Sequence, residues 1–234
     1  MCLSCRVRFC GFRLSAAVML LVSGAAMGGP LEEAEGWQLR HVDEGQGIEI
    51  YRRDRPDRMP EFLAVTRVTA RLATLVALLR DVEAMPRWVY RTREVQVLEG
   101  DDPMRGLVRV LTAMPWPLND REALVEWQWR QDPVSGEVRL DGARATPRAA
   151  PMDGVVRMPQ FSSRWRFLPL PGGAVEVRFT GHGHMGGNLG MEPLRSFVAT
   201  AAWLAPLETM RGLREMIQLP AYRNARVAFV RELP

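Results

Sequence analysis

The most specific segment of the sequence is 115–122, Pro-Trp-Pro-Leu-Asn-Asp-Arg-Glu, which leads directly into the run Ala123–Arg130 (ALVEWQWR). A proline on each side of Trp116 restricts the backbone, so we expect an extended loop there. Asp120 and Arg121 stand at the junction, where charge-assisted hydrogen bonds can hold the loop against the next element. In the run that follows, apolar residues alternate with polar ones, which is typical of a half-buried strand. The segment therefore predicts a fixed loop followed by a strand.

Further strand patterns lie on both sides of this segment, separated by turns rich in glycine, proline and aspartate. Short strands joined by such turns predict an antiparallel meander. The predicted strands are 48–53, 62–70, 94–98, 107–113, 138–143, 163–168 and 174–180.

Three stretches predict helices. Acidic residues at the start of Leu31–Arg40 suit a first helical turn, and apolar residues recur at helical spacing in Leu72–Leu79. Leu194–Ile217 predicts a long C-terminal helix with a kink at Pro206. Helix, strands, helix, many strands and a final helix indicate an α+β architecture in which a curved antiparallel sheet wraps around the last helix. Such a sheet can leave a cavity between itself and the helix.

Several short strings accompany this order of elements. Besides 115–122, they are Gly47–Tyr51 in the first predicted strand, Trp88 after the early helix, Val155–Arg157, and Gly186–Leu189 before the last helix. Together they resemble the START family of lipid-transfer domains over Trp37–Ile217. The resemblance implies a helix-grip fold that encloses a hydrophobic tunnel, closed by the C-terminal helix. It also implies that this helix, or a gate loop at Trp116 and Pro117, moves to admit a ligand.

The sequence departs from the family in two places. His184, Met185 and Gly190 replace residues of the usual Asp-Pro-Gly-Gly and Leu-Pro pattern before the last helix. Sterol-carrying members are expected to place a buried acid and an arginine where this chain has Val108 and Trp127. The resemblance therefore does not imply that a buried ion pair orients the ligand.

The alternation of side chains selects candidate cavity residues. Residues two apart on a strand share one face, and small residues on the helix opposite large aromatic ones leave room. The alternative for each of them is ordinary core packing. The predicted cavity residues are Val108, Val110, Thr112, Val125, Trp127, Trp129, Trp165, Phe167, Phe179, Phe197, Ala201 and Leu204.

The N-terminus has the order of a secretory signal. Arg6, Arg8 and Arg13 precede an apolar run at 14–22, and small residues follow it. The run is about half the length of a membrane-spanning helix, so we expect a signal peptide at 1–28, cleaved after Ala25 or up to three residues later, although an uncleaved anchor is the alternative. We expect one domain over 29–234 and a periplasmic or secreted protein.

Composition limits the chemistry. The three cysteines all precede the apolar run, so the expected mature chain has neither a disulfide nor a thiol nucleophile. The basic residues are all arginine, and without the three in the leader the formal charge falls from +4 to +1. Near-neutral, dispersed charge argues against nucleic acid as a partner. His182 and His184 could bind a metal, but their glycine neighbours favour a solvated turn. We expect no metal and no cofactor.

Three hypotheses follow for function. The first is a monomeric carrier that binds, or binds and transfers, a lipid or another apolar small molecule without covalent chemistry and with at most transient membrane contact. The second is a cyclase or aromatase acting in the same cavity, with Tyr90 or Tyr51 and Arg109 as candidate acid and base. The third is a non-transport interaction module whose groove is filled by its own side chains.

Overall fold

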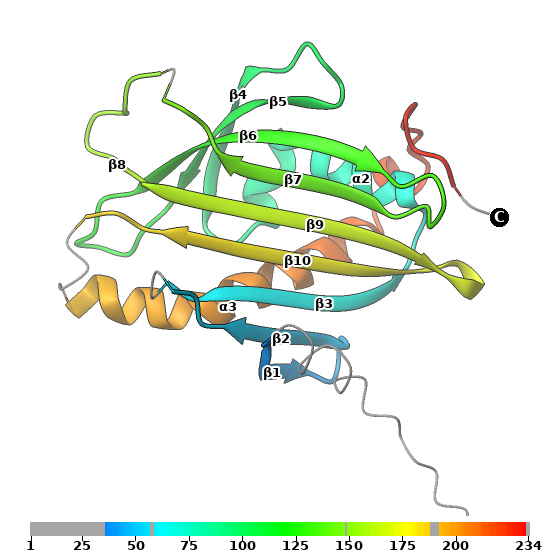
Figure 1. Ribbon diagram of the computed structural model, residues 1–234, viewed down its shortest axis with the longest axis horizontal. Coiled ribbons are helices and arrows are strands. Elements are labelled where there is room, and N and C mark those ends of the chain that lie inside the picture. Colours follow the sequence, from blue (N-terminus) through cyan, green and yellow to red (C-terminus); the bar gives the residue numbers. More distant parts are fainter. Residues whose placement is uncertain (1–35, 57–58, 148, 188–191, 233–234) are drawn as a thin grey trace, which may run out of the picture.

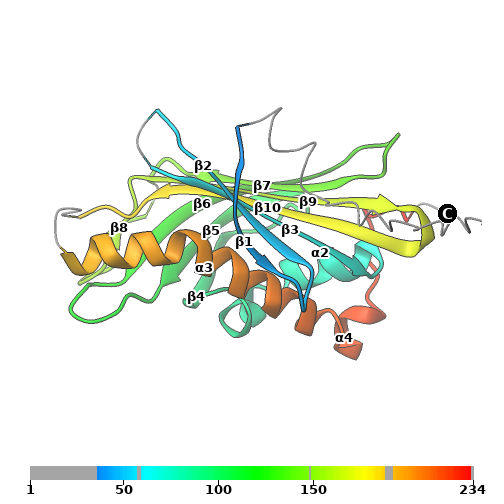
Figure 2. The ribbon, with the colours of Figure 1, turned by 90° about the horizontal axis from the view of Figure 1, so that it is seen from below.

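One large antiparallel sheet forms a layer of the protein, and the helices lie against one of its faces (Figures 1 and 2). The computed structural model describes residues 36–56, 59–147, 149–187 and 192–232. The strand order is β1-β2-β3-β10-β9-β7-β6-β5-β4, and the two-residue β8 pairs with β6 in parallel. The strands are β1 (Gln38–Asp43), β2 (Ile48–Arg53), β3 (Glu61–Thr69), β4 (Thr92–Glu99), β5 (Arg105–Thr112), β6 (Arg121–Gln131), β7 (Val138–Arg144), β8 (Val156–Arg157), β9 (Gln160–Leu170) and β10 (Ala174–His184).

The helical layer consists of α2 (Leu72–Arg80), α3 (Glu192–Met216) and α4 (Pro220–Arg223), with a 3₁₀ helix at Val82–Arg87. Figure 2 shows α3 running along the face of the sheet, which we call the inner face. A further 3₁₀ turn, Pro171–Gly173, joins β9 to β10. Within the described part of the chain, no helix is both long and apolar enough to cross a membrane. The predicted α+β helix-grip architecture is confirmed.

The main core lies between the inner face and the helices. Alternate residues of the central strands, such as Val138, Phe167 and Val177, are fully buried there. The C-terminal half of α3 covers them with Leu207, Met210, Leu213 and other apolar residues. This half of the helix therefore packs directly on the sheet.

The end of the chain completes α2. The residue before this helix, Arg71, provides no side-chain cap. Instead, the carboxylate of Glu232 accepts hydrogen bonds from the backbone N–H groups of Leu72 and Ala73 at 3.0 and 2.9 Å. A negative charge at a helix N-terminus also interacts favourably with the helix dipole. The segment after α3 is therefore part of the domain.

The predicted N-terminal helix is wrong where it can be compared. Residues 38–40 belong to β1, which pairs with β2, and residues 31–35 lie outside the described part of the chain. The hairpin satisfies the backbone groups of β1, and Trp37 is buried against Tyr51, Leu63 and Val65. Tertiary pairing thus overrides the local helix signal of the acidic residues.

Candidate ligand-binding cavity

A cavity of about 300 Å³ lies between the inner face of the sheet and the early helices. The 3₁₀ helix and the segment after it contribute Val82, Met85 and Trp88, and strands β4 to β7, β9 and β10 form the opposite wall. Most of the lining is apolar. The lining residues are Leu79, Arg80, Val82, Met85, Trp88, Val89, Thr92, Val95, Val97, Gly100, Asp102, Val108, Val110, Val125, Trp127, Trp129, Leu140, Gly142, Phe161, Ser163, Trp165 and Phe179.

A smaller lobe of about 160 Å³ lies beside it, under the N-terminal half of α3. The helix lines this lobe with Val198, Ala201, Ala202 and Ala205, which follow the spacing of one helical face. The two lobes share Phe161, Ser163 and Phe179 as lining residues. We therefore treat them as neighbouring parts of one chamber.

A row of small residues crosses the inner face where the lobes meet. Gly142 of β7 pairs with Ser163 of β9, which pairs with Gly181 of β10. The row continues to Trp127 on one side and to Phe62 on the other. Gly142 and Ser163 leave space above the sheet, whereas the ring of Phe62 covers Gly181.

The aromatic side chains at the ends of this row lie over glycines, Trp127 over Gly106 outside the row and Phe62 over Gly181 within it. A Cβ atom at Gly106 would lie 2.7 Å from Cζ2 of Trp127, and a Cβ atom at Gly181 would overlap the ring of Phe62. Phe62 meets Phe179 edge to face with ring centroids 5.3 Å apart, and Phe179 stacks on Trp165 at 4.1 Å. The glycines therefore let the aromatic rings form the walls of the chamber.

One polar group inside this apolar wall has no partner. Trp88 is 4% exposed and lines the larger lobe. Its indole N–H is buried and has no hydrogen-bond acceptor among the described residues. A buried donor without an acceptor costs free energy, so an acceptor atom on a ligand would stabilise the complex.

The structure brings most of the predicted cavity residues together. Val108, Val110, Val125, Trp127, Trp129, Trp165 and Phe179 line the larger lobe, and Ala201 lines the smaller one. Thr112, Phe167, Phe197 and Leu204 line neither lobe. Phe167 is fully buried in the main core, one cross-strand row beyond Trp165. That the lining residues bind a ligand stays a prediction.

The misplaced helix residues have a simple cause. The apolar residues of α3 include two overlapping stripes, one through Phe197 and Leu204 and one through Val198 and Ala205. The second stripe faces the chamber. Phe197 instead lies beside the Arg91 guanidinium, 5.6 Å from its ring centroid. Helical periodicity alone could not choose between the stripes.

Sequence reasoning missed the contribution of the early helix and the small residues. In the sequence, Trp88 stands out only as part of a family string, and Gly142 and Ser163 carry no signal as isolated residues. Ser163 lies two positions before Trp165, so alternation could have placed it on the inner face. The pairing of Gly142 with Ser163 becomes visible only when the strand register is known.

The candidate acid and base residues of the enzyme hypothesis lie elsewhere. Tyr51 is buried on the outer face of the sheet with Trp37, Leu63 and Val65. Arg109 alternates with the lining residues Val108 and Val110, and its guanidinium contacts Gln96, Glu122 and the carbonyl of Ala150. Tyr90 is not among the residues that line either lobe. These side chains therefore do not form a catalytic pair in the chamber.

The loop at 115–119 is fixed at its base and exposed at its tip. Asp120 accepts a hydrogen bond from the backbone N–H of Met114 at 2.9 Å, and Arg121 donates to the carbonyls of Asn119 and Met185. The prediction that these two residues tie down the loop is confirmed. The side chain of Trp116 is 92% exposed. That Trp116 and Pro117 form a gate stays a prediction.

Three of the strings noted in the sequence meet at the base of this loop. Arg121 and Glu122 of β6 pair with Val156 and Arg157 of β8. Gly186 packs against this pair, because a Cβ atom there would lie 3.1 Å from the Arg157 carbonyl. Glu122 is fully buried and accepts hydrogen bonds from Arg157. The strings are therefore structural. Asn188 and Leu189 lie outside the described residues.

The two histidines near the last helix lie in a strand and not in the predicted turn. His182 and His184 are the last alternate residues of β10, which extends four residues beyond the predicted strand. Nδ1 of His184 accepts a hydrogen bond from the backbone N–H of Gly186 at 2.9 Å. Among the described residues, no group of three or more histidine, cysteine or acidic side chains could hold a metal ion.

Comparison with protein families agrees with this geometry. The model of the START domain matches residues 24–216. The chain belongs to the START domain family. A STAR-related lipid transfer protein of Xanthomonas axonopodis has a TM-score of 0.69 to this structure at 22% identity, covering 79% of this chain and 100% of the other.

Other relatives share this fold at low identity. Human StAR-related lipid transfer protein 5 has a TM-score of 0.68 at 12% identity, over 80% of this chain and 88% of the human one. An uncharacterized protein of Pseudomonas aeruginosa is 27% identical over 206 residues, which cover 85% of this chain and 92% of the relative. The structural likenesses establish a START fold, and the chemistry of this chain has to be argued from its own chamber.

Proposed function

We propose that this START domain binds an apolar small molecule of the lipid class in the two-lobed chamber and shields it from water without covalent chemistry. The observation that carries the proposal is the larger lobe, about 300 Å³ of space enclosed mainly by apolar side chains. A groove filled by its own side chains would leave no such space. Membership of the START family supports the same function.

The size of the chamber favours a small cargo. Pockets for drug-sized ligands measure about 300–1,000 Å³, so the larger lobe is at the lower end of that range. One acyl chain or one compact polycycle suits this space better than a lipid with two long chains. Burial of about 300 Å² of apolar ligand surface would contribute roughly 7 kcal/mol before the entropic cost of association.

The indole N–H of Trp88 supports a cargo that carries an acceptor. A hydroxyl, carbonyl or ester oxygen on the ligand could accept this buried donor, whereas a pure hydrocarbon could not. The ligand we propose is therefore apolar over most of its surface with one oxygen acceptor near the early helix.

Ligand entrance and cellular context remain part of the proposal. The exposed Trp116 at the tip of the 115–119 loop supports a gate that touches a membrane transiently during exchange. The N-terminal signal pattern supports export to the periplasm or beyond, where a monomeric carrier could move its cargo between membranes.

The test uses the small-residue row. Ser163→Phe places a ring in the space that the lobes share, so we expect binding of a fluorescent fatty acid to weaken roughly tenfold or more. Ser196→Phe is the matched control, because Ser196 is exposed on α3 and lines neither lobe. Titration of the fatty acid into folded protein measures both.

The result we expect is loss of binding in Ser163→Phe and retained binding in Ser196→Phe. Equal affinities for the two variants would show that the ligand does not occupy the chamber. Turnover of the bound molecule by the unmodified protein would instead favour the enzyme hypothesis.

A further inference from the structure

The outer face of the sheet carries four arginines in one line. Arg130 of β6 pairs with Arg139 of β7, which pairs with Arg166 of β9, which pairs with Arg178 of β10. Their neighbours along the strands, such as Phe167, point to the inner core, so the arginines point outward. Adjacent strands are about 4.8 Å apart, which gives the line a length of roughly 15 Å.

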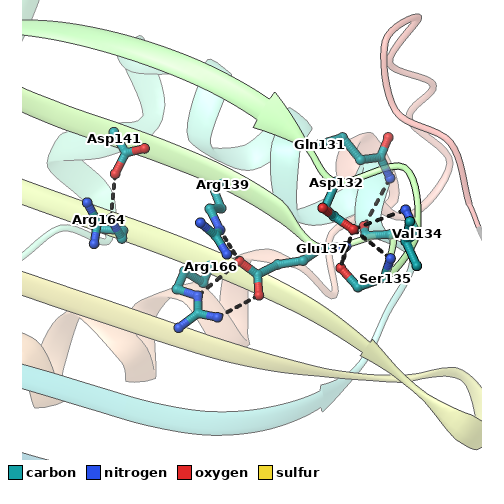
Figure 3. Close-up of polar contacts among 10 residues, drawn as sticks. Gln131, Asp132, Val134, Ser135, Glu137, Arg139, Asp141, Arg164 and Arg166 are labelled. Atoms are coloured by element: carbon teal, nitrogen blue, oxygen red, sulfur yellow. Dashed lines mark hydrogen bonds and ion pairs between the residues drawn. The ribbon is translucent and has the colours of Figure 1, made fainter. Parts of the chain in front are cut away.

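Two glutamates lie beneath this line. Glu137 binds Arg139 and Arg166, as Figure 3 shows, and Glu176 binds Arg178 and Arg67. The carboxylate side chains are only 6% and 8% exposed. Their partners are 21% to 50% exposed, so solvent meets guanidinium groups and not carboxylates.

The neighbouring row adds one more arginine and one acid. Arg164 is 58% exposed and pairs with Asp141, which is 32% exposed (Figure 3). Glu126 lies farther along β6, at the edge of this region. We call the surface formed by Arg67, Arg130, Arg139, Arg164, Arg166, Arg178, Glu137, Asp141 and Glu176 the outer arginine face. It contains six arginines and three acidic residues, so its formal charge is positive.

Folding alone does not account for this arrangement. Like charges directly opposite each other on adjacent strands are destabilising, and the line contains three such pairs in succession. The buried glutamates offset part of this repulsion. An external layer of anions would offset the rest, and guanidinium groups bind phosphate oxygens in a bidentate manner.

The surface lacks the apolar anchors of a typical protein interface. The large apolar side chains that are exposed within the described residues are Leu39, Val42, Val97, Trp116, Val134, Trp203 and Leu219, and none lies on β7, β9 or β10. Protein interfaces usually depend on a few buried aromatic or apolar residues. A surface of phosphates requires no such anchor. We propose that the outer arginine face docks the protein electrostatically onto a membrane of anionic lipids.

The experiment is sedimentation with vesicles that contain phosphatidylglycerol and with vesicles of phosphatidylcholine alone. The test variant is Arg130→Gln/Arg164→Gln, because neither arginine holds one of the buried glutamates. The control is Arg223→Gln/Arg226→Gln, which removes the same charge from exposed positions at and after α4. All proteins are expressed as the full chain, have their N-termini determined by mass spectrometry, and are checked for folding by circular dichroism.

We expect the unmodified protein and the control to bind the anionic vesicles at low salt and to release them as salt rises. The test variant should bind roughly 10- to 30-fold more weakly. Equal binding by test variant and control, or no binding by the unmodified protein, would overturn the proposal. So would binding to an acidic polypeptide without binding to anionic vesicles. Cargo binding in the chamber should be unchanged in the test variant, which separates this inference from the proposed function.

Discussion

At the scale of single residues, the chamber depends on which side chains are absent as much as on which are present. The alternation of Val125, Trp127 and Trp129 predicted correctly that one face of β6 contributes to the cavity wall. The space itself comes from Gly142 and Ser163, which adjoin only through strand register. A single sequence does not give the strand register. The aromatic and apolar lining of β6 could therefore be predicted, but the space above Gly142 and Ser163 could not.

Trp88 leads to the first prediction at this scale. Trp88→Phe removes the indole N–H but keeps an aromatic ring. If the N–H binds the cargo, the variant should bind a fatty acid methyl ester roughly 3- to 10-fold more weakly. Binding of the corresponding hydrocarbon should change little, because it has no acceptor. Competition with a fluorescent ligand measures both affinities.

The hydrocarbon serves as the internal control for packing. An equal loss of affinity for ester and hydrocarbon would mean that Trp88 acts through its ring alone. No loss for either would mean that Trp88 does not contact the cargo.

At the scale of elements, most strands and the long helix follow from periodicity, but their ends and partners do not. The predicted helix at Leu194–Ile217 corresponds closely to α3. β1 departs from prediction because its partner β2 competes with the local helix signal. Carboxylates placed between two arginines also connect elements, and their sequence positions gave no indication of this. Glu137, directly before β7, binds Arg166 of β9.

The ion pairs of Glu137 with Arg139 and Arg166, which we call the clamp, lead to a prediction on the pH dependence of stability. Burial by itself raises the pKa of Glu137, but hydrogen bonds from Arg166 and Arg139 outweigh it, so the pKa is lower than in the unfolded chain. The clamp therefore stabilises the fold above the unfolded pKa of about 4.3, and this contribution is lost as pH falls through the lowered pKa. The pKa values of Glu61 and Glu176 are lowered in the same way, because hydrogen bonds from arginines outweigh the effect of burial.

Glu137→Gln should reduce the free energy of unfolding at pH 7 by about 1–2 kcal/mol, a modest value because the arginines are partly exposed. The difference from the unmodified protein should shrink as pH falls below the unfolded pKa and the carboxyl of the folded, unmodified protein also takes up a proton. Urea unfolding across this pH range measures it. The exposed Glu215→Gln on α3 is the control and should have little effect at any pH. A difference for Glu137→Gln that is independent of pH would rule out the charge as its cause.

At the scale of the whole molecule, the order of elements and a few strings were enough to indicate the START fold. The strings at 119–122, 155–157 and 186–187 meet at one place, which explains why they occur together although they are far apart in the sequence. The chamber and the outer arginine face lie on opposite faces of the sheet. Both depend on cross-strand pairing between distant segments, so neither could be read from the chain as a linear pattern.

In the carrier that we propose, the two faces of the sheet have different roles. The inner face holds the cargo, and the outer face holds the protein near an anionic membrane. Because the buried glutamates and the chamber residues alternate along the same strands, a change to one face need not alter the other. The variants on each face can therefore be examined separately.

The most direct test of the central claim is native mass spectrometry, with organic extraction, of the protein purified from the cells that naturally produce it. The proposed function predicts one apolar molecule per chain, small enough for the chamber and carrying an oxygen acceptor. The same protein with Ser163→Phe should lack this molecule, and the protein with Ser196→Phe should retain it. A protein that is reproducibly empty, and that takes up no fatty acid, ester or sterol when these are offered, would contradict the claim.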